Sequence, residues 1–346
     1  MQQEIAFPAP LLAPDGRLTT AGWARHPLLD CNLEDARFYP APLRPLQFLR
    51  IKRWDYYAVF TPRRFFSATI ADLGYAANLF VYTLDFETNE LYEESLIAPL
   101  GGGVILPRNS TEGDAYFNDG RVRILLRATP DARALFVDWP AFKQAGGIRA
   151  DITLACPPRH ESMNIVIPIG PRRFYFNRKV NCMPARGYIH FGDIREELNP
   201  RESIGSLDWG RGVWDYKSFW NWASASGFLP DGRTIGLNLG TGFGDTSAAT
   251  ENAVILDGRI HKLEQVPFVY DPKDYMHPWR FKDAAGRLDL EFVPFRERLA
   301  RTNLLLIQSE VHQMFGRYSG RIVTEEGEVI RLDGLTGFAE EHHARW

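Results

Sequence analysis

The sequence SLDWGRGVWDYKSFWNWASASGFLPDGRTIGLNLG, residues 206–240, contains four of the nine tryptophans in this chain of 346 residues. These four, Trp209, Trp214, Trp220 and Trp222, are interleaved with charged residues. Indole rings bury a large apolar area but carry an N–H group that needs a partner, and buried charges must be paired. The mixture therefore indicates a segment that lines a cavity or fixes a ligand.

Extended segments separated by turn residues continue outward from this stretch in both directions. Asp231-Gly232 separates the Trp-rich segment from the apolar run 234–240, and Asp119-Gly120 and Asp257-Gly258 separate other such runs. Asp-Gly suits type I′ hairpin turns, in which both central residues need positive φ. Most of the runs are rich in β-branched and aromatic residues, and the long helical crossovers that parallel sheets need are not evident. The pattern predicts antiparallel meanders.

We therefore predict an all-β protein of two antiparallel β-barrels or curved β-sandwich halves packed together, with few short helices. A chain of 346 residues exceeds the usual size of one core, so we predict an N-terminal β domain over residues 1–200 and a C-terminal β domain over residues 201–346. Residues 193–202 fit one polar turn of helix, and residues 214–223 fit either a short helix or an aromatic strand.

Composition and charge argue against several classes of protein. The net charge of −3 leaves no electrostatic footprint for nucleic acid. The N-terminal residues do not resemble a secretory signal, and no apolar run approaches the length of a transmembrane helix. The cysteines, Cys31, Cys156 and Cys182, are widely spaced and form no CxxC motif. We expect a cytoplasmic location, no metal and no cofactor; the sequence carries no signal of oligomeric state.

Asp208 is the first candidate for a catalytic residue. If its segment is extended, Asp208, Gly210 and Gly212 share one face, and the glycines open room for a ligand beside the carboxylate. Neighbouring indoles desolvate a carboxylate, and desolvation raises its pKa toward a value useful for general acid catalysis. We predict catalytic roles for Asp208 and Tyr216 and a ligand-binding role for Arg211. The alternative is a buried structural ion pair between Asp208 and Arg211.

The four tryptophans, Trp209, Trp214, Trp220 and Trp222, are predicted ligand-binding residues. Trp220 and Trp222 share one face if their segment is a strand. Aromatic faces suit flat apolar ligands, sugars or a cation, so Trp214 and Trp222 could flank a carbocation formed by protonation of an alkene. The alternative is that these side chains form a core or the seam between two barrels.

Two further pairs are candidates. His160-Glu161 precedes an apolar run and is predicted to bind ligand, because a carboxylate can tune the pKa of a histidine; the alternative is a loop cap or a hydrogen-bonded bridge between domains. Glu251-Asn252 follows the loop 240–250, which is rich in small residues. This loop lacks the phosphate-binding motifs, and we expect it to be a flexible loop at the entrance of a cavity. We predict Glu251 as a catalytic residue at that rim and Asn252 as a ligand-binding residue.

Separated motifs occur in order along essentially the whole chain, and they include Gly22–Pro27, Lys52–Tyr56, His160–Ser162, Ser206–Gly227, His312–Gly320 and Gly337–Glu341. Together they resemble the bacterial family called domain of unknown function 2804, and that resemblance implies no particular activity.

A remoter resemblance rests on three short strings. Asp208-Trp209-Gly210, Trp220-Asn221-Trp222 and Leu229–Gly232 are similar in order to strings of the carotenoid hydratase and tocopherol cyclase group. That resemblance implies two lipocalin-like barrels, and the addition of water to, or ring closure on, hydrophobic prenyl-type substrates.

The hypothesis that follows is a Trp-rich cavity built largely from residues 206–227 and 251–252. We predict a cofactor-independent hydratase, cyclase or isomerase that acts on a hydrophobic lipid or isoprenoid by general acid catalysis. The alternatives are a non-catalytic protein that binds lipids or other hydrophobic ligands, and a carbohydrate-active or sugar-binding protein.

Overall fold

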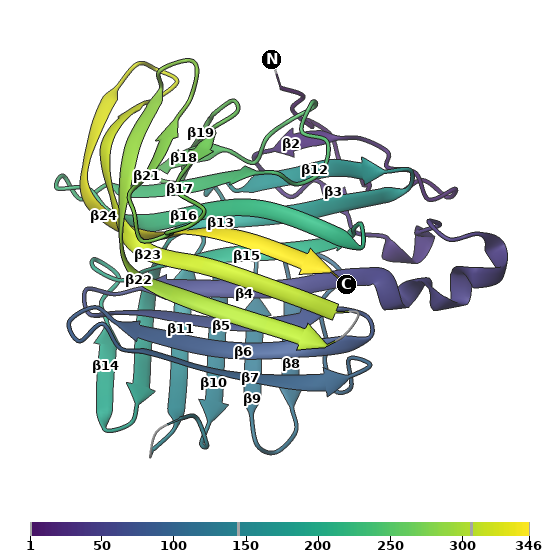
Figure 1. Cartoon of the computed structure of the whole chain (residues 1–346), viewed down its shortest axis with the longest axis horizontal. Coiled ribbons are helices and arrows are strands. Elements are labelled where there is room, and N and C mark those ends of the chain that lie inside the picture. Colours follow the sequence, from purple (N-terminus) through teal and green to yellow (C-terminus); the bar gives the residue numbers. More distant parts are fainter. Residues whose placement is uncertain (1, 144–145, 305–306, 346) are drawn as a thin grey trace.

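The computed structural model describes residues 2–143, 146–304 and 307–345, which form mostly antiparallel strands in two large curved sheets (Figure 1). The prediction of an all-β protein of two packed, curved, lipocalin-like halves is confirmed. The helices of the described residues are the 3-10 helices η1 (Leu33–Asp35) and η2 (Ala41–Arg50). Neither has the length and apolar character that crossing a bilayer would require.

The first sheet has 13 strands. They are β2 (Gly22–Ala24), β4 (Ile51–Phe60), β5 (Arg64–Asp72), β6 (Ala76–Asp85), β7 (Leu91–Pro99), β8 (Gly113–Asn118), β9 (Arg123–Ala128), β10 (Ala132–Trp139), β11 (Ile148–Ala155), β12 (Met163–Gly170), β13 (Arg173–Phe191), β14 (Ile194–Leu198) and β15 (Ile204–Val213). Their order is β7-β6-β5-β4-β15-β13-β11-β10-β9-β8, with β12 and β14 attached to β13 and β2 attached to β12. The short strands β1 (Ala9–Pro10) and β3 (Leu29–Asp30) form a separate parallel pair.

The second sheet has 9 strands. They are β16 (Lys217–Phe228), β17 (Thr234–Thr241), β18 (Ala253–Leu256), β19 (Arg259–Lys262), β20 (Phe268–Val269), β21 (Trp279–Lys282), β22 (Leu288–Leu304), β23 (Ile307–Val323) and β24 (Val329–Arg345). Their order is β19-β18-β17-β16-β24-β23-β22-β21-β20. The chain passes from the first sheet to the second between Val213 and Lys217. Separate domains over residues 1–200 and 201–346 stay a prediction.

The three Asp-Gly pairs all connect antiparallel neighbours, as predicted. Only at Asp257-Gly258 do both residues have positive φ, 50° and 77°, as a type I′ turn requires. The local prediction of helix was less successful. Residues 194–198 of the segment 193–202 form strand β14 rather than a helical turn, and residues 217–223 of the ambiguous segment belong to strand β16.

Strands β4, β13 and β15, which we call the dividing strands, separate the interior of the first half from the layer between the two sheets. Every residue of β15 is buried. Alternate side chains, such as Tyr57 and Trp209, pack in the first core, whereas Tyr56 and Tyr175 pack between the sheets. Because both faces are covered, these strands lack the polar alternation of a sheet with one wet face.

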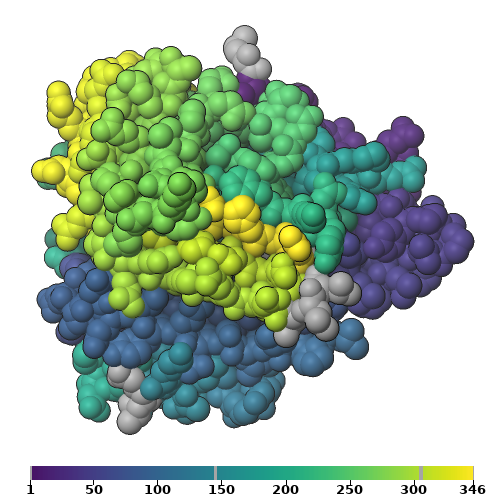
Figure 2. All heavy atoms as spheres, in the orientation of Figure 1, coloured from purple at the N-terminus to yellow at the C-terminus, as the bar shows by residue number. Residues whose placement is uncertain are grey.

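The second sheet packs directly on the dividing strands and on β5 to β7, and its green-to-yellow atoms cover the blue atoms of the first sheet in Figure 2. A bulge in β13 between Val180 and Met183 lies where the two sheets pack together. At the bulge, Asn181 Nδ2 donates to Ser224 Oγ at 3.0 Å and to the carbonyl oxygen of Leu237 at 3.2 Å. The amide therefore ties the first sheet to β16 and β17.

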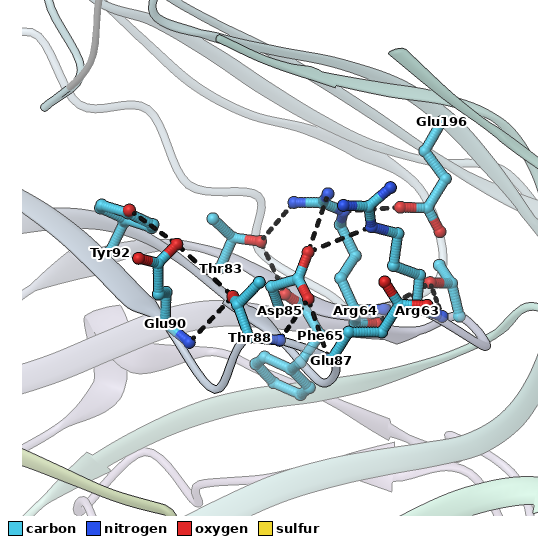
Figure 3. Close-up of polar contacts among 11 residues, drawn as sticks. Arg63, Arg64, Phe65, Thr83, Asp85, Glu87, Thr88, Glu90, Tyr92 and Glu196 are labelled. Carbon is cyan, nitrogen blue, oxygen red and sulfur yellow. Dashed lines mark hydrogen bonds and ion pairs between the residues drawn. The ribbon is translucent and has the colours of Figure 1, made fainter. Parts of the chain in front are cut away.

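A buried polar cluster ties β5, the β6–β7 turn and β14 together (Figure 3). Arg64, whose side chain is 2% exposed, donates from Nε to Glu196 Oε2 at 2.5 Å. Arg63 Nε donates to Asp85 Oδ2 at 3.1 Å, and Asp85 Oδ1 accepts from two backbone N–H groups of the turn. None of Arg63, Arg64, Asp85 and Glu196 is among the described residues that line the cavity described next.

Candidate active site between the two sheets

A cavity of about 530 Å³ lies between the sheets, on the side of the dividing strands that faces away from the first core. One wall comes from β4 to β7, β13 and β15, and the other from β16 and β22 to β24. The loop between β17 and β18 adds Phe243 and Glu251. The volume lies within the range of small-molecule sites.

Five of the residues predicted from the sequence line this cavity. They are Asp208, Trp214, Trp220, Trp222 and Glu251. Trp220 and Trp222 share one face of β16, as the strand alternative for this segment requires. The Trp-rich segment therefore supplies part of the wall, but most of the wall comes from strands far away in the sequence.

Lys179 on β13 is a buried cation that lines this cavity, together with Lys52 and Arg298, and it was not predicted from the sequence. Its Nζ atom donates to Asp208 Oδ2 at 2.8 Å and lies 3.7 Å from Glu251 Oε2. The same atom lies 3.8 Å from the ring centroid of Trp222, which is a cation–π contact. The ammonium therefore joins two of the predicted acidic residues to one of the predicted tryptophans.

Asp208 accepts two further hydrogen bonds. Asn177 Nδ2 donates to its Oδ1 atom at 2.6 Å, and Trp54 Nε1 donates to the same oxygen at 3.1 Å. With Lys179 on the other oxygen, Asp208 has the set of donors that an ionised carboxylate needs.

The alternative of a structural ion pair between Asp208 and Arg211 is wrong, because Arg211 pairs with Asp55 and Asp208 pairs with Lys179. The two side chains lie on opposite faces of β15, because residues three apart on a strand point in opposite directions. Arg211 points into the first core and donates to Asp55 Oδ1 at 2.9 Å and to the Trp54 carbonyl oxygen at 2.8 Å. Trp209 shares that face, and its ring packs 4.2 Å from the Arg211 guanidinium. Neither Arg211 nor Trp209 is among the described residues that line the cavity.

Glu251 lies against the cavity wall immediately before β18. Burial raises the pKa of Glu251, although the Lys179 ammonium opposes this shift. A Cβ atom at Gly240 would lie 2.2 Å from Glu251 Oε1, so only glycine leaves room for this carboxyl group. Asn252 Oδ1 accepts from the Gly240 N–H at 2.7 Å. Asn252 therefore holds the backbone beside Glu251, and it does not itself line the cavity among the described residues.

Glu340 on β24 is a third acidic residue of the cavity. Its Oε1 atom accepts from Trp220 Nε1 at 3.2 Å, and its Oε2 atom accepts from Gln313 Nε2 at 3.2 Å. Burial raises the pKa of Glu340 to about 7, against the opposing effects of Trp220 and Lys179. In the sequence, Glu340 falls within the motif Gly337–Glu341 and was not predicted as a site residue. The available signal was a glutamate beside Phe338 and Ala339, in a segment whose alternate residues must be buried.

A chain of hydrogen bonds fixes the amide that holds Glu340. The Tyr56 and Tyr82 hydroxyls lie 2.9 Å apart, and Tyr82 OH donates to Gln313 Oε1 at 2.9 Å. Because the Gln313 oxygen accepts from Tyr82, its NH₂ group faces Glu340. The amide orientation is therefore set by the neighbouring tyrosines.

His342 lies two residues further along the same face of β24. Its ring centroid lies 3.9 Å from that of Trp220, and its Nε2 atom lies 2.8 Å from Ser309 Oγ. Burial, assisted by the positive charge of Arg298, lowers the pKa of His342 to about 3. The imidazole is therefore neutral at physiological pH and is a hydrogen-bonding group rather than a charge.

The other predicted residues lie outside the cavity. Tyr216 is 41% exposed, in the connection between β15 and β16. His160 Nε2 lies 2.6 Å from the Asn181 carbonyl oxygen, and burial lowers the pKa of His160. Glu161 Oε2 accepts from Arg25 at 3.0 Å and from the backbone N–H of Ile260 on β19 at 2.7 Å. The bond between Glu161 and Ile260 joins the first half to the second sheet. This is the hydrogen-bonded bridge that was the alternative to a ligand-binding role.

The space above Gly210 is occupied by a side chain of the protein rather than left open for a ligand. A Cβ atom at Gly210 would lie 1.9 Å from Cζ2 of Trp54, and that indole donates to Asp208. As predicted, the absence of a side chain at Gly210 leaves space above the backbone. The group that fills this space is the indole ring of Trp54 rather than a ligand.

Gly210→Ala is therefore expected to displace Trp54, to lower the free energy of unfolding by about 1–3 kcal/mol and to weaken ligand binding in the cavity. Urea unfolding and ligand titration would measure both effects. Gly170→Ala is the matched control, because a Cβ atom there meets no heavy atom within 4 Å. Equal stability of the two variants would contradict the close packing of Trp54 on β15.

Within residues 2–143, 146–304 and 307–345, no group of three or more His, Cys, Asp and Glu side chains is arranged to hold a metal ion. The three cysteines are buried free thiols.

One family model and several solved structures are similar to this chain. The family model described as "Domain of unknown function (DUF2804)" matches residues 2–346. No curated protein matches the chain. The crystal structure of CghA with Sch210972 is similar over 85% of this chain and 88% of that chain, with 11% identity and a TM-score of 0.55. Kievitone hydratase from Nectria haematococca is similar over 85% and 88% of the two chains, with 12% identity and a TM-score of 0.49. At such identities the similarity concerns the fold.

Proposed function

This chain belongs to the DUF2804 family, and we propose that it is a cofactor-independent hydratase, cyclase or isomerase that protonates a hydrophobic alkene of the lipid or isoprenoid kind. The observation that carries this proposal is that three buried carboxyl groups, on Asp208, Glu251 and Glu340, lie around the ammonium group of Lys179. The buried Arg298 guanidinium of the same cavity is already bonded to Glu93. The local excess of carboxyl groups around Lys179 favours a protonated one, beside aromatic rings such as those of Trp214 and Trp220.

One ammonium compensates one carboxylate, and a further buried negative charge is costly. Asp208 has the 2.8 Å contact with Lys179 and two other donors, so it holds the negative charge. Burial raises the pKa of both Glu251 and Glu340, and the pKa of Glu340 reaches about 7, so Glu340 retains its proton at neutral pH more readily than an ordinary glutamate. A carboxylic acid with a pKa near 7 is suited to donate a proton at neutral pH.

Glu340 is our first choice for the general acid, and Glu251 is the second. Both Glu340 oxygens accept hydrogen bonds from Trp220 and Gln313, so the O–H of the neutral acid is left for a molecule in the cavity. Transfer of that proton to an alkene carbon breaks the O–H bond, forms a C–H bond and leaves a carbocation beside a carboxylate. In hydration, water adds to the cation and the resulting oxonium ion gives a proton back to the carboxylate. In isomerisation, the cation loses a neighbouring proton to the carboxylate. In cyclisation, a second double bond attacks the cation and closes a ring, and the new cation then takes up water or loses a proton in the same way.

The aromatic wall suits the stabilisation of such a cation. Lys179 already lies over the Trp222 ring, so we assign this role to Trp220 and to Trp214, whose ring centroids lie 5.6 Å apart. CghA, which is similar in fold, was solved with the small molecule Sch210972. A small organic ligand in this fold fits the proposal.

The direct test is incubation of the purified protein with farnesol, geranylgeraniol and squalene in D₂O, followed by mass spectrometry of the extracted products. All three reactions would introduce deuterium at carbon, and hydration would in addition add a hydroxyl group to the product. Binding of these compounds without incorporation of deuterium would favour the non-catalytic lipid-binding alternative. Binding of sugars in their place would contradict the proposal.

The pH dependence of turnover is a second prediction. An acid with a pKa of about 7 is protonated below that pH, so turnover is expected to be constant in the acid range and to fall tenfold per pH unit above about pH 7. Initial rates between pH 5 and pH 9, with circular dichroism to verify folding, would measure it. A rate that rises through pH 7 would indicate that these groups act as bases instead.

A further inference from the structure

One region of the cavity wall has buried polar atoms that the general acid does not use. Thr69 on β5 and Asn78 on β6 both line the cavity, and Thr69 is 2% exposed. Among the described residues, neither Thr69 Oγ1 nor Asn78 Oδ1 has a hydrogen-bond partner, although both atoms are buried. A buried polar atom without a partner is costly, and few such atoms occur in native proteins.

The sheet register brings these two side chains together on one face. Thr69 pairs with Phe80 and Ala71 pairs with Asn78, so Thr69 and Asn78 are diagonal neighbours across β5 and β6. Diagonal side chains on one face lie within reach of each other or of one bridging group. The small side chain of Ala71, next to both, leaves room above the sheet. The next residue after each of them, Ile70 and Leu79, points into the first core instead.

We propose that Thr69 and Asn78 form a subsite for the hydroxyl group of a hydrophobic alcohol. A hydroxyl group can accept from the Thr69 O–H and donate to Asn78 Oδ1 at the same time, which satisfies both atoms. A hydrocarbon satisfies neither atom, and an ether satisfies only one. This inference rests on the proposed function in one respect, which is that the alcohol bound at the subsite is also the proposed substrate.

The position of the subsite also indicates which double bond would react. Tyr82, which reaches Glu340 through Gln313, lies four residues beyond Asn78 on β6 and faces the cavity too. At the rise of an extended strand this separation is about 13 Å. A substrate with its hydroxyl group at Thr69 and Asn78 therefore presents a double bond far from that hydroxyl group, rather than an allylic one, to Glu340.

The test compares two probes, farnesol and farnesyl methyl ether, by tryptophan-fluorescence titration of the full chain. The ether keeps the hydrocarbon body and the oxygen but cannot donate to Asn78. Wild type is expected to bind farnesol at least about tenfold more tightly than the ether. Thr69→Val, which keeps the side-chain shape, is expected to lose about tenfold in affinity for farnesol. Asn78→Leu is expected to abolish the preference for the alcohol.

Thr336→Val on β24 is the matched control, because this partly buried threonine is not among the described residues that line the cavity. It should retain the preference for farnesol. Equal affinity of wild type for both probes, no binding of farnesol, or an undiminished preference in both subsite variants would overturn the inference. So would binding of methyl glucoside in place of farnesol.

The outcomes separate this inference from the proposed function. Selective binding of farnesol without deuterium incorporation in D₂O would support the subsite and contradict the proposed catalysis. Turnover that depends on Glu340, with no preference for the alcohol, would support the catalysis and overturn the subsite.

Discussion

Replacing Glu340 with glutamine is expected to lower turnover by about 10²- to 10⁴-fold, the range that a positioned general acid contributes. Glutamine keeps the shape of the side chain and can still accept from Trp220 Nε1, but it has no acidic proton to donate. Ligand affinity is expected to remain close to that of wild type, so the effect should fall on kcat rather than on KM. Steady-state rates and fluorescence titration would measure the two quantities.

Two other variants make this comparison specific. Glu94→Gln changes a carboxyl group that is only partly buried on the same cavity wall, and it should leave turnover unchanged. Glu251→Gln tests the second candidate for the acid. A loss of turnover in Glu251→Gln together with full activity in Glu340→Gln would exchange the roles that we assign to these two residues.

The stability of Glu340→Gln offers a check that needs no substrate. The folded-state pKa of about 7 lies above the ordinary value of 4.5, so between these pH values the folded protein holds a proton that the unfolded chain has released. The free energy of unfolding therefore falls as pH rises through this window, and the variant lacks this contribution. The quantity to compare is the free energy of unfolding of Glu340→Gln minus that of wild type. This difference should be larger at pH 8 than at pH 5 by up to about 3 kcal/mol. An unchanged difference between the two pH values would show that Glu340 titrates normally.

Replacing Arg211 with methionine is expected to lower the free energy of unfolding by about 3–5 kcal/mol, because it leaves a buried carboxyl group without its partner. The side chains of Arg211 and Asp55 are 1% and 6% exposed. Burial already raises the pKa of Asp55, and loss of the guanidinium would raise it further. Urea unfolding at neutral pH would measure the change.

The control for this prediction is Arg121→Met, which breaks an ion pair with Asp119 in which the arginine side chain is 73% exposed. Exposed pairs contribute only about 0–1 kcal/mol. Replacing both Arg211 and Asp55, by methionine and leucine, should recover much of the lost stability, since no buried charge is then left alone. If Arg211→Met were no more destabilising than Arg121→Met, the buried pair would not be a main stabilising contact of the first half.

The fold could be predicted from the sequence because its signals are local. Turn dipeptides such as Asp257-Gly258 and β-rich runs indicate antiparallel strands without knowledge of their partners. The opposite orientations of Asp208 and Arg211 were also available, since residues three apart on a strand cannot share a face. Applying that parity would have excluded the ion pair and would have assigned Trp209 to the core.

The partners in the cavity could not be predicted, because long-range packing decides them. Lys179 precedes Asp208 by 29 residues and reaches it only through the register of β13 with β15. Glu340 arrives from the far end of the chain, where the second sheet packs on the dividing strands. Its partner Gln313 lies on β23, the neighbour of β24. No local sequence pattern predicts these contacts between distant residues.

The two-faced burial of β15 has a consequence for how this family can diverge. Each side chain of the strand faces either the first core or the layer between the sheets, and these surroundings restrict which residues can replace it. No side chain of β15 faces water, where substitutions would be tolerated more easily. Homologous sequences should therefore show two interleaved sets of correlated substitutions along β15, one with Asp55 and one with Lys179. New ligand preferences would arise more readily on β22 and β23, where residues such as Leu299 and Arg301 reach the cavity from partly solvated positions. Selection would then adjust the ligand from the second sheet and keep the dividing strands nearly constant.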